Sequence, residues 1–207
     1  MSEYYLEYMS DQERFPRAGF NRSKRVFVEQ TIRARLPAGA RVLDLGCGPG
    51  WVSHNLIGDY RVVGVDVEAD AVQLCRLRYD ADYLVGSAFS LPTAAGQFDA
   101  VIFTEAIEHF AQPAPALAEI ARVLKPGGLA LITTPNCGSL FWILIENTWH
   151  RFFGGPCKPY SREVHPSRFT RRSLGALLSQ FLAVESIESV WFGLILTAVA
   201  RKGGASP

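Results

Sequence analysis

The stretch VLDLGCGPG at residues 42–50 decides the fold of this chain. Its first half is a short apolar run that is typical of a buried strand. Its second half carries Gly46, Gly48 and Gly50, and glycines allow a tight turn in which backbone passes close to a ligand. The start of a following helix would offer unpaired N–H groups to an anionic group. We therefore predict a strand over 41–45, a ligand-binding loop, and a helix over 52–57.

The spacing of the glycines separates this loop from other nucleotide-binding loops. The dinucleotide pattern GxGxxG would need a glycine where the chain has Trp51, and the sequence has no GxxxxGK[ST] phosphate loop. Asp66 ends the next predicted strand, where an acid can bind both hydroxyls of an adenosine ribose. The local alternatives are that Asp44 caps a turn and that Asp66 caps the helix after it.

Strand-like and helical patterns alternate along the chain, which predicts βαβ units and a parallel sheet. Further strands are expected at 61–65, 83–85, 98–103 and 129–133, and helices at 69–77, 115–124 and 170–181. The strand-like runs 183–189 and 193–200 are too close for a crossover helix, so they should form an antiparallel hairpin near one edge. The expected fold class is α/β, a Rossmann-like, mostly parallel sheet of seven strands with helices on both faces.

Composition places the chain among ordinary globular proteins. It has 207 residues, of which 48% are hydrophobic and 20% charged, and its longest apolar run, at 140–145, is far shorter than the roughly 20 residues of a spanning helix. The N-terminus resembles no signal peptide. No two of the four cysteines have the CxxC spacing of a zinc site. We expect a cytoplasmic protein with reduced cysteines.

Four further motifs follow the glycine loop in order. They are GSAFSLP at 86–92, FDAV at 98–101, EAIEH at 105–109 and LKPGG at 124–128. Together with the glycine loop and Asp66, this ordered set resembles class I S-adenosylmethionine-dependent methyltransferases. The match spans about 42–136, nearly half the chain, and is most similar to the small-molecule enzymes of the ubiquinone-biosynthesis type. The later HPSRFT at 165–170 is similar to them too.

The resemblance implies S-adenosyl-L-methionine as cofactor, with S-adenosyl-L-homocysteine as product. It implies that Asp44 holds the loop and interacts with the methionine ammonium, and that Asp66 binds the ribose diol. The other cofactor-binding positions that it implies are Gly46, Cys47, Gly48 and Gly50 in the loop, Val67, Ser87, Ala88 and Phe89 around adenine, and Glu105 at the amino group. Ser87 departs from the family, which usually has Asp there.

The acceptor should lie beside residues 104–109, because ligands in such folds bind at the carboxyl ends of the strands. His109 could take a proton from a hydroxyl acceptor, since the unperturbed pKa of histidine is near neutrality. The alternative is that His109 only braces the loop. His165 is a second candidate base, and His54 should have no catalytic role. No grouping of His, Asp and Glu in the sequence indicates a metal site.

Two basic segments flank an acidic middle: residues 14–35 hold seven bases and one acid, and residues 151–172 hold six bases and one acid. A solvated face is the usual explanation. In relatives, however, both segments border the acceptor pocket, which implies a positive mouth that attracts an anionic acceptor or an anionic membrane. The aromatic-rich stretch 138–160 could be a packed helix or dimer face, a lid, or part of a membrane contact through 138–162.

The expected function is S-adenosylmethionine-dependent methyl transfer to a small molecule, at a hydroxyl oxygen of an aromatic, lipidic or anionic metabolite. The alternatives are N- or C-methylation, or a cofactor-binding module without catalysis. We expect no nucleic-acid substrate, because 105–108 offers no aromatic side chain to stack on a flipped base. We expect one domain, as a monomer or homodimer, with a cap (1–40), a cofactor-binding core (41–136), a lid segment (137–172) and a C-terminal helix and hairpin (173–207).

Overall fold

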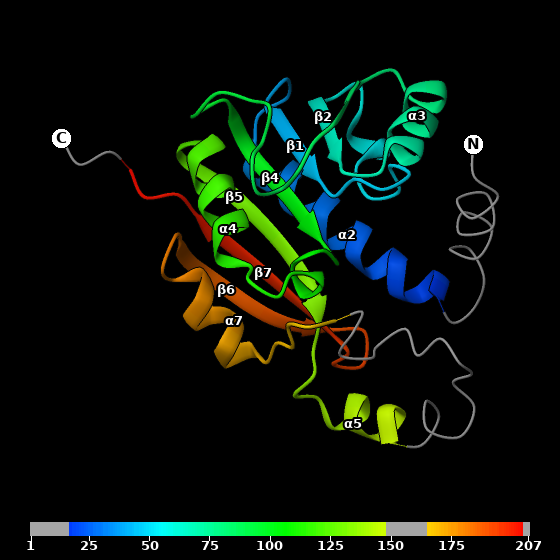
Figure 1. Cartoon of the computed structure of the whole chain (residues 1–207), viewed down its shortest axis with the longest axis vertical. Helices are drawn as coiled ribbons and strands as arrows, with labels where there is room; N and C mark the ends of the chain where they lie inside the picture. The colour runs from blue at the N-terminus through cyan, green and yellow to red at the C-terminus, as the bar shows by residue number, and fades with distance from the viewer. Residues whose placement is uncertain (1–16, 148–164, 205–207) are drawn as a thin grey trace.

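The structure is a computed structural model that describes residues 17–147 and 165–204. Seven strands form one sheet in the order β3-β2-β1-β4-β5-β7-β6 (Figure 1). The strands are β1 (Arg41–Leu45), β2 (Arg61–Asp66), β3 (Asp82–Val85), β4 (Phe98–Thr104), β5 (Leu124–Pro135), β6 (Ala183–Val190) and β7 (Ile195–Arg201). Strands β1 to β5 pair in parallel, and β7 pairs antiparallel with β5 and β6. The predicted sheet and terminal hairpin are confirmed.

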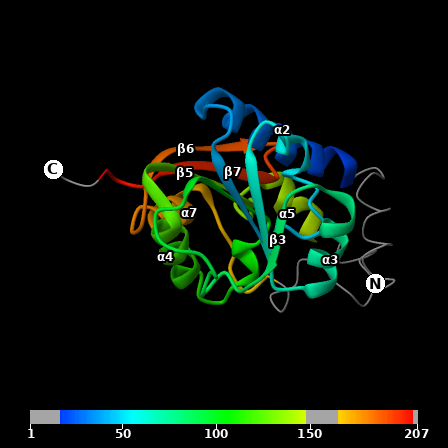
Figure 2. The ribbon, with the colours of Figure 1, turned by 90° about the horizontal axis from the view of Figure 1, so that it is seen from above.

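Helices cover both faces of the sheet (Figure 2). They are α2 (Arg17–Arg35), α3 (Ala69–Arg78), α4 (Ala114–Val123), α5 (Leu140–Asn147) and α7 (Arg171–Leu178), with the short 3-10 helices η1 (His54–Leu56) and η2 (Ile107–His109). Val28 of α2 packs with Val42 on one face, while Leu117 of α4 and Leu174 of α7 pack with Leu43 on the other. Among the described residues, no helix combines the length and apolar character needed to cross a membrane.

Two segments differ from the prediction. The helix expected over 52–57 is only the 3-10 turn η1, because Gly50 and Gly58 adopt positive φ angles of 81° and 97° on either side of it. The β-branched Val52 and Ile57 favour a helix little. The basic segment before β1, for which no helix was predicted, forms the 19-residue helix α2.

The strand order switches sides between β1 and β4: β2 and β3 are added on one side of β1, and β4 and β5 are then added on the other. Ligands of open α/β sheets bind at the carboxyl ends of the strands near such a point. A hollow of about 590 Å³ lies elsewhere: its lining includes Arg41, Asp82 and Phe98, the first residues of β1, β3 and β4. The candidate site is therefore the carboxyl edge and not this hollow.

Candidate functional site

The glycine loop turns over the end of β2 and is open on one side. The N–H of Gly46 donates to the carbonyl of Val65 at 2.7 Å. Gly46, Gly48 and Gly50 have φ angles of 70°, 48° and 81°, in the left-handed region that glycine adopts without steric cost. A Cβ placed on Gly48 would meet nothing within 4 Å, whereas one on Gly50 would lie 2.7 Å from the ring of Tyr79. The loop is thus closed against α3 and has free space above Gly48.

Cys47 supports the loop from below. It is buried in one small cluster with Cys75 and Tyr83, and the Cys75 thiol donates to the carbonyl of Gly48 at 3.2 Å. Hydrogen bonding to Cys75 and burial raise the pKa of Cys47. The Cys47 thiol therefore stays protonated, and because it is buried, Cys47 offers a ligand only its backbone.

Asp44 lies buried beneath the glycine loop with 1% of its surface exposed, and its Oδ2 has no hydrogen-bond partner among the described residues. Burial is the main reason that the pKa of Asp44 rises to about 7; the neighbouring Ser53 hydroxyl opposes the rise, and the charge of Asp66 adds to it. A turn-capping role explains this poorly, because an unpaired buried carboxylate oxygen costs free energy. A cationic ligand group would supply the missing partner.

Asp66 ties the end of β2 to the glycine loop. Its Oδ2 accepts a hydrogen bond from the N–H of Gly48 at 2.7 Å, and its Oδ1 accepts one from the N–H of Glu68 at 3.0 Å. The second bond matches the local capping role that the sequence allowed, whereas the first spans two separate loops. A carboxylate has about four acceptor positions, so two remain for the hydroxyls of a diol.

Apolar side chains stand exposed beside Asp66. Val67 is 68% exposed and Phe89 is 47% exposed, and the ring of Phe89 lies 4.7 Å from that of Phe110. Ser87 does not project freely, because its hydroxyl oxygen accepts a hydrogen bond from the N–H of Phe89 at 3.2 Å. Ala88 packs on the core. These residues leave a surface on which a flat aromatic ring could stack.

Two acids follow β4 and face the end of β5. Glu105 has a positive φ of 50°, and its Oε1 accepts a hydrogen bond from the Thr133 hydroxyl at 2.9 Å. Glu108 is 2% exposed and accepts a hydrogen bond from the Thr134 hydroxyl at 3.1 Å. Burial, and then the negative charge of Glu105, raise the pKa of Glu108 well above its usual range. A positive charge close to the carboxyl groups of Glu105 and Glu108 would therefore be stabilised.

Lys24 of α2 supplies one such charge and was missed by the sequence analysis. Only 8% of it is exposed, and its ammonium lies 4.3 Å from the ring centre of Phe20. Burial lowers the pKa of Lys24, while the charges of Glu105 and Glu108 oppose that shift. A sequence signal existed: Lys24 stands four residues before Val28, in the apolar stripe of the helix, where a lysine needs a reason to be buried.

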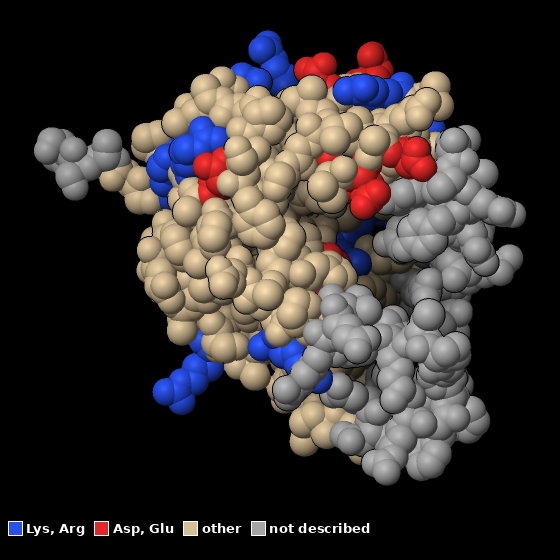
Figure 3. Space-filling model, viewed as in Figure 1, with Lys and Arg blue, Asp and Glu red and all other residues tan. Residues whose placement is uncertain are grey.

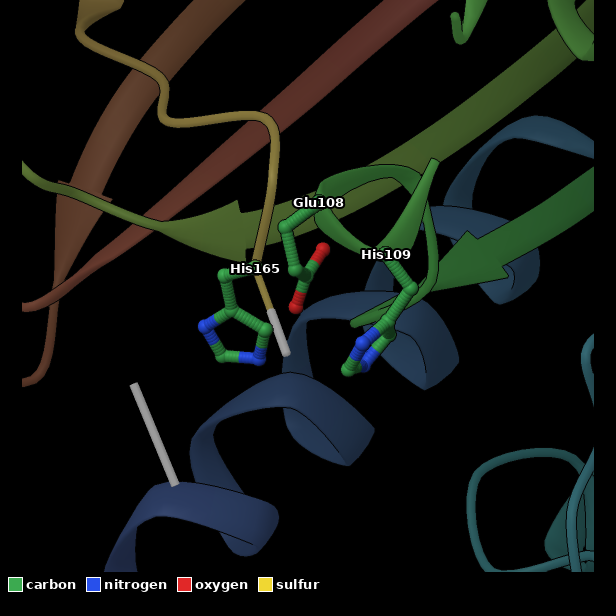
Figure 4. A group of neighbouring side chains, drawn as sticks. All are labelled: Glu108, His109 and His165. Atoms are coloured by element: carbon green, nitrogen blue, oxygen red, sulfur yellow. The ribbon is translucent and has the colours of Figure 1, made fainter. Parts of the chain in front are cut away.

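Glu108, His109 and His165 point toward one another (Figure 4). One ligand atom of each lies within 4.8 Å of the others, and the two imidazole rings are 4.7 Å apart. Burial, with the charge of His109, lowers the pKa of His165 to about 4, so His165 is neutral near pH 7. One carboxyl group and two imidazoles form a donor set that suits a divalent transition metal. No such grouping was expected from the sequence.

Hydrogen bonds of Ser167 bring His165 to this place. The N–H of Ser167 donates to the carbonyl of Glu108 at 3.2 Å, and its hydroxyl donates to the carbonyl of Phe110 at 2.6 Å. The N–H of Cys137 donates to the carbonyl of Phe169 at 3.0 Å, which fixes the same segment to the end of β5.

A small pocket lies beside the histidines. Its lining consists of Glu108, Pro135, Cys137, Trp142, His165, Ser167 and Arg168. The surface of this side of the molecule is hollowed, and acidic and basic atoms both appear in the hollow (Figure 3). Residues 148–164 of the predicted lid segment and residues 1–16 of the predicted cap lie outside the described residues.

Comparison with known proteins matches this chain to methyltransferases. A family model described as "Methyltransferase domain" matches residues 43–132. A ubiquinone biosynthesis O-methyltransferase from Xanthomonas axonopodis pv. citri (strain 306) is 39% identical over 113 residues, which are 51% of this chain and 47% of that protein. The chain thus spans about half the length of the curated relatives it matches.

Solved structures share the fold over nearly the whole chain. A protein from Pyrococcus horikoshii OT3 superposes with a TM-score of 0.71 at 21% identity, over 98% of this chain and 99% of that one. A Haloferax volcanii putative methyltransferase, solved in complex with the Trm112 methyltransferase activator, superposes with a TM-score of 0.71 at 21% identity, over 92% of this chain and 95% of that one. At these identities the likeness shows the fold alone, and it confirms the Rossmann-like class.

Proposed function

Because residues 43–132 match a family model described as a methyltransferase domain, we propose that this chain binds S-adenosylmethionine and transfers its methyl group to a hydroxyl oxygen of a small molecule. The observation that carries the proposal is the buried, unpaired Oδ2 of Asp44 below the open glycine loop. S-adenosylmethionine would supply an electrophilic methyl group, and the protein supplies orientation and electrostatics.

The residues at the carboxyl ends of β1, β2 and β3 suit each part of that cofactor. Asp44 offers a carboxylate oxygen to the methionine ammonium, and the backbone of the glycine loop lines the ribose and methionyl parts. Asp66 retains two acceptor positions for the ribose hydroxyls. Exposed Val67 and Phe89 offer apolar surface to adenine.

Lys24 completes the methionyl end. The methionyl part carries a carboxylate as well as an ammonium, and a buried carboxylate requires a cation. Lys24 is the buried lysine that faces Glu105 and Glu108, so we assign its ammonium to the carboxylate and Glu105 to the amino group. This assignment gives the buried lysine a ligand-binding reason to be there.

The cluster of Glu108, His109 and His165 activates the acceptor. Neutral imidazole can take a proton from a hydroxyl group or ligate a cation. Since Glu108 contributes a carboxylate to the same small volume, we propose that the cluster holds a divalent cation. A bound cation would lower the pKa of a hydroxyl group that coordinates it. If no cation binds, His109 and His165 are the proton acceptors.

The pocket next to this cluster has a volume of about 10 Å³, which is room for about one water-sized group. Trp142 and Pro135 provide apolar walls, and Arg168 provides a positive charge. It could therefore receive only the reacting group of an acceptor, whose aromatic or lipidic body would lie outside it.

Thermal unfolding with candidate ligands tests the cofactor assignment. S-adenosylhomocysteine at about 100 times its Kd should stabilise the protein by about 2.7 kcal/mol, and NAD and ATP should not. Asp66→Ala should lose this stabilisation, because Asp66 both anchors the loop and faces the ribose. A shift with NAD but not with S-adenosylhomocysteine would contradict the proposal.

Chelation tests the acceptor end separately. EDTA should abolish methyl transfer and leave S-adenosylhomocysteine binding unchanged, and Mn²⁺ or Mg²⁺ should restore activity. If EDTA has no effect, the histidine pair acts directly as the base.

A further inference from the structure

Two aromatic rings connect the buried Lys24 ammonium to the turn between β6 and β7. Phe20 and Lys24 are four residues apart on α2, so they lie on the same face of the helix. The Lys24 nitrogen is 4.3 Å from the centre of the Phe20 ring. That ring meets the Trp191 indole edge to face, with 5.4 Å between the ring centres and an angle of 77° between the planes. We call Trp191, Phe20 and Lys24 the lysine row.

The Phe20 ring holds the Lys24 ammonium without neutralising it. Burial lowers the pKa of Lys24, and the charges of Glu105 and Glu108 oppose that shift. The face of an aromatic ring also favours the charged form of the lysine, yet it carries no net charge of its own. A ring can therefore fix the position of the ammonium and leave its charge for the carboxylate of a ligand.

Trp191 occupies a backbone conformation that tryptophan rarely adopts. Its φ is 47°, and the next residue, Phe192, has a φ of 58°. Both values lie in the left-handed region, where a bulky residue is an outlier. Such conformations persist only where the surrounding structure determines them, and they cluster at functional sites. The indole at this position therefore needs a reason beyond the shape of the turn.

The indole lies directly on the backbone of α2. A Cβ placed on Gly19 would be 2.8 Å from the Nε1 of Trp191, so a side chain at Gly19 would push the indole away. Gly19 comes just before Phe20, whose ring receives the indole on one side and the Lys24 ammonium on the other end of the row. The glycine thus allows the contact on which the lysine row depends.

The end of β5 holds this turn and the two acids of the site together. Figure 1 shows the end of β5 beside the turn between β6 and β7, where the two strands pair. The side-chain amide of Asn136, the first residue after β5, donates to the carbonyl of Gly193 at 2.8 Å. The threonines at 133–134 of the same strand donate to Glu105 and Glu108. One strand end therefore sets both the lysine row and the acids that Lys24 faces.

We propose that Trp191 is a positioning residue: through the Phe20 ring it holds the Lys24 ammonium where the carboxylate of the bound nucleoside lies. This inference rests on the assignment of Lys24 to that carboxylate in the proposed function. Its consequence is selectivity. The site should prefer nucleosides that carry the carboxylate, and that preference should depend on Trp191. A purely structural Trp191 would instead affect every nucleoside alike.

The test compares two nucleosides by calorimetry with the full chain. S-adenosylhomocysteine carries an ammonium and a carboxylate, whereas its decarboxylated form keeps the adenosine and the ammonium and lacks the carboxylate. The wild type should bind S-adenosylhomocysteine about 100-fold more tightly than the decarboxylated form, the upper range for a hydrogen bond between charged groups. Lys24→Met should remove this preference.

Substitutions in the two aromatic residues should reduce the same preference. Trp191→Asn should lower the affinity for S-adenosylhomocysteine about fivefold and leave that for the decarboxylated form unchanged; asparagine tolerates the positive φ. Phe20→Leu keeps an apolar side chain and loses the ring, so it should lower the same affinity about tenfold. Phe20→Tyr keeps the ring and should bind as wild type.

Phe192→Asn is the matched control. Phe192 follows Trp191 in the same turn, also has a positive φ, and is 78% exposed, so this variant should bind both nucleosides as wild type. Equal losses for the two nucleosides in Trp191→Asn would overturn the proposal, as would equal effects of Trp191→Asn and Phe192→Asn. If Trp191→Asn does not fold, Phe20→Leu decides, and an unchanged preference in that variant overturns the proposal.

The wild type separates this inference from the proposed function. If it binds neither nucleoside, the proposed function and the lysine row are both wrong. If it binds both equally, Lys24 has no carboxylate to pair with and the inference fails, while cofactor binding stands. If it prefers S-adenosylhomocysteine and the preference survives in Trp191→Asn and Phe20→Leu, only the positioning role of Trp191 is overturned.

Discussion

The proposed cofactor end and the proposed acceptor end of the site are formed by different kinds of contacts. At the cofactor end, backbone N–H groups and carboxylates meet across neighbouring loops, as when Gly48 donates to Asp66, 18 residues away. At the acceptor end, side chains come from distant segments, as when Ser167 donates to Phe110, 57 residues away. The first end therefore depends on local sequence and strand register, and the second on tertiary packing. Substitutions at one end should therefore impair that end and leave the other end unchanged.

The strongest separation should come from the histidines. His109→Ala and His165→Ala should each lower turnover by about 10² to 10⁴, the range for a lost acid–base group. Binding of S-adenosylhomocysteine should not change, because neither residue lies at the cofactor end. Turnover is measured as S-adenosylhomocysteine release with a panel of hydroxyl acceptors, and binding by calorimetry. His54→Gln, outside the cluster, serves as the control. If the two alanine variants lose S-adenosylhomocysteine binding as well as turnover, the two ends of the site are not independent.

Asp44→Asn should act on the cofactor end alone. It removes the buried carboxylate that we assign to the methionine ammonium, so S-adenosylhomocysteine affinity should fall about 100-fold, the upper range for a hydrogen bond to a charged group. The free protein should become more stable, because the uncompensated buried charge is gone. Calorimetry and urea unfolding measure the two effects. Unchanged affinity together with lower stability would make Asp44 purely structural.

The pH dependence of stability and of S-adenosylhomocysteine affinity should test the same assignment of Asp44. Asp44 has a folded-state pKa of about 7, above an unfolded value near 3.9. The native protein thus holds the proton that the unfolded chain releases, and the contribution of Asp44 to stability falls as pH rises from about 4 to 7. Asp44→Asn should remove that fall. Since only the ionised form binds the ammonium, S-adenosylhomocysteine affinity should rise about tenfold from pH 6 to 8, and a flat profile would contradict the assignment.

Ser167→Ala should give the smallest effect and test how His165 is positioned. Loss of the hydroxyl bond to the Phe110 carbonyl should cost about 1 kcal/mol of unfolding free energy and lower turnover several-fold, while cofactor binding stays constant. Ser179→Ala removes a comparable bond, from Ser179 to the carbonyl of Gly175 at 2.8 Å, far from the site. If both variants lose turnover equally, Ser167 has no positioning role.

The arrangement of the proposed cofactor end could be predicted from sequence, because its groups occupy fixed places in one motif and at one strand end; that it binds a cofactor stays a prediction. Asp44, the glycines and Asp66 lie together where the spacing placed them. The helix expected at 52–57 was wrong for a local reason: Gly50 and Gly58, both with positive φ, leave room for only the short turn His54–Leu56. The hydroxyl oxygen of Ser87 accepts a hydrogen bond from the N–H of Phe89, and its contact with adenine stays a prediction.

The arrangement of the proposed acceptor end could not be predicted from sequence, because it depends on contacts between segments that are distant in the chain. His165 was a candidate base, yet nothing in the sequence places it within 4.8 Å of Glu108 and His109. That proximity depends on the two bonds of Ser167. Lys24 was one base among seven in its segment; its place four residues before Val28 was the one local signal, and the burial of α2 against the sheet shows what it means.

The two hydrogen bonds that Asp66 accepts, from the N–H groups of Gly48 and Glu68, have a kinetic consequence. The glycine loop is already fastened in the free protein, so its conformational entropy is lost during folding and not during ligand capture. The glycine loop should therefore be preformed when a nucleoside binds. The association rate constant should then be set by diffusion and little reduced by loop rearrangement. Discrimination between substrate and product nucleosides should then lie almost entirely in how fast each one leaves.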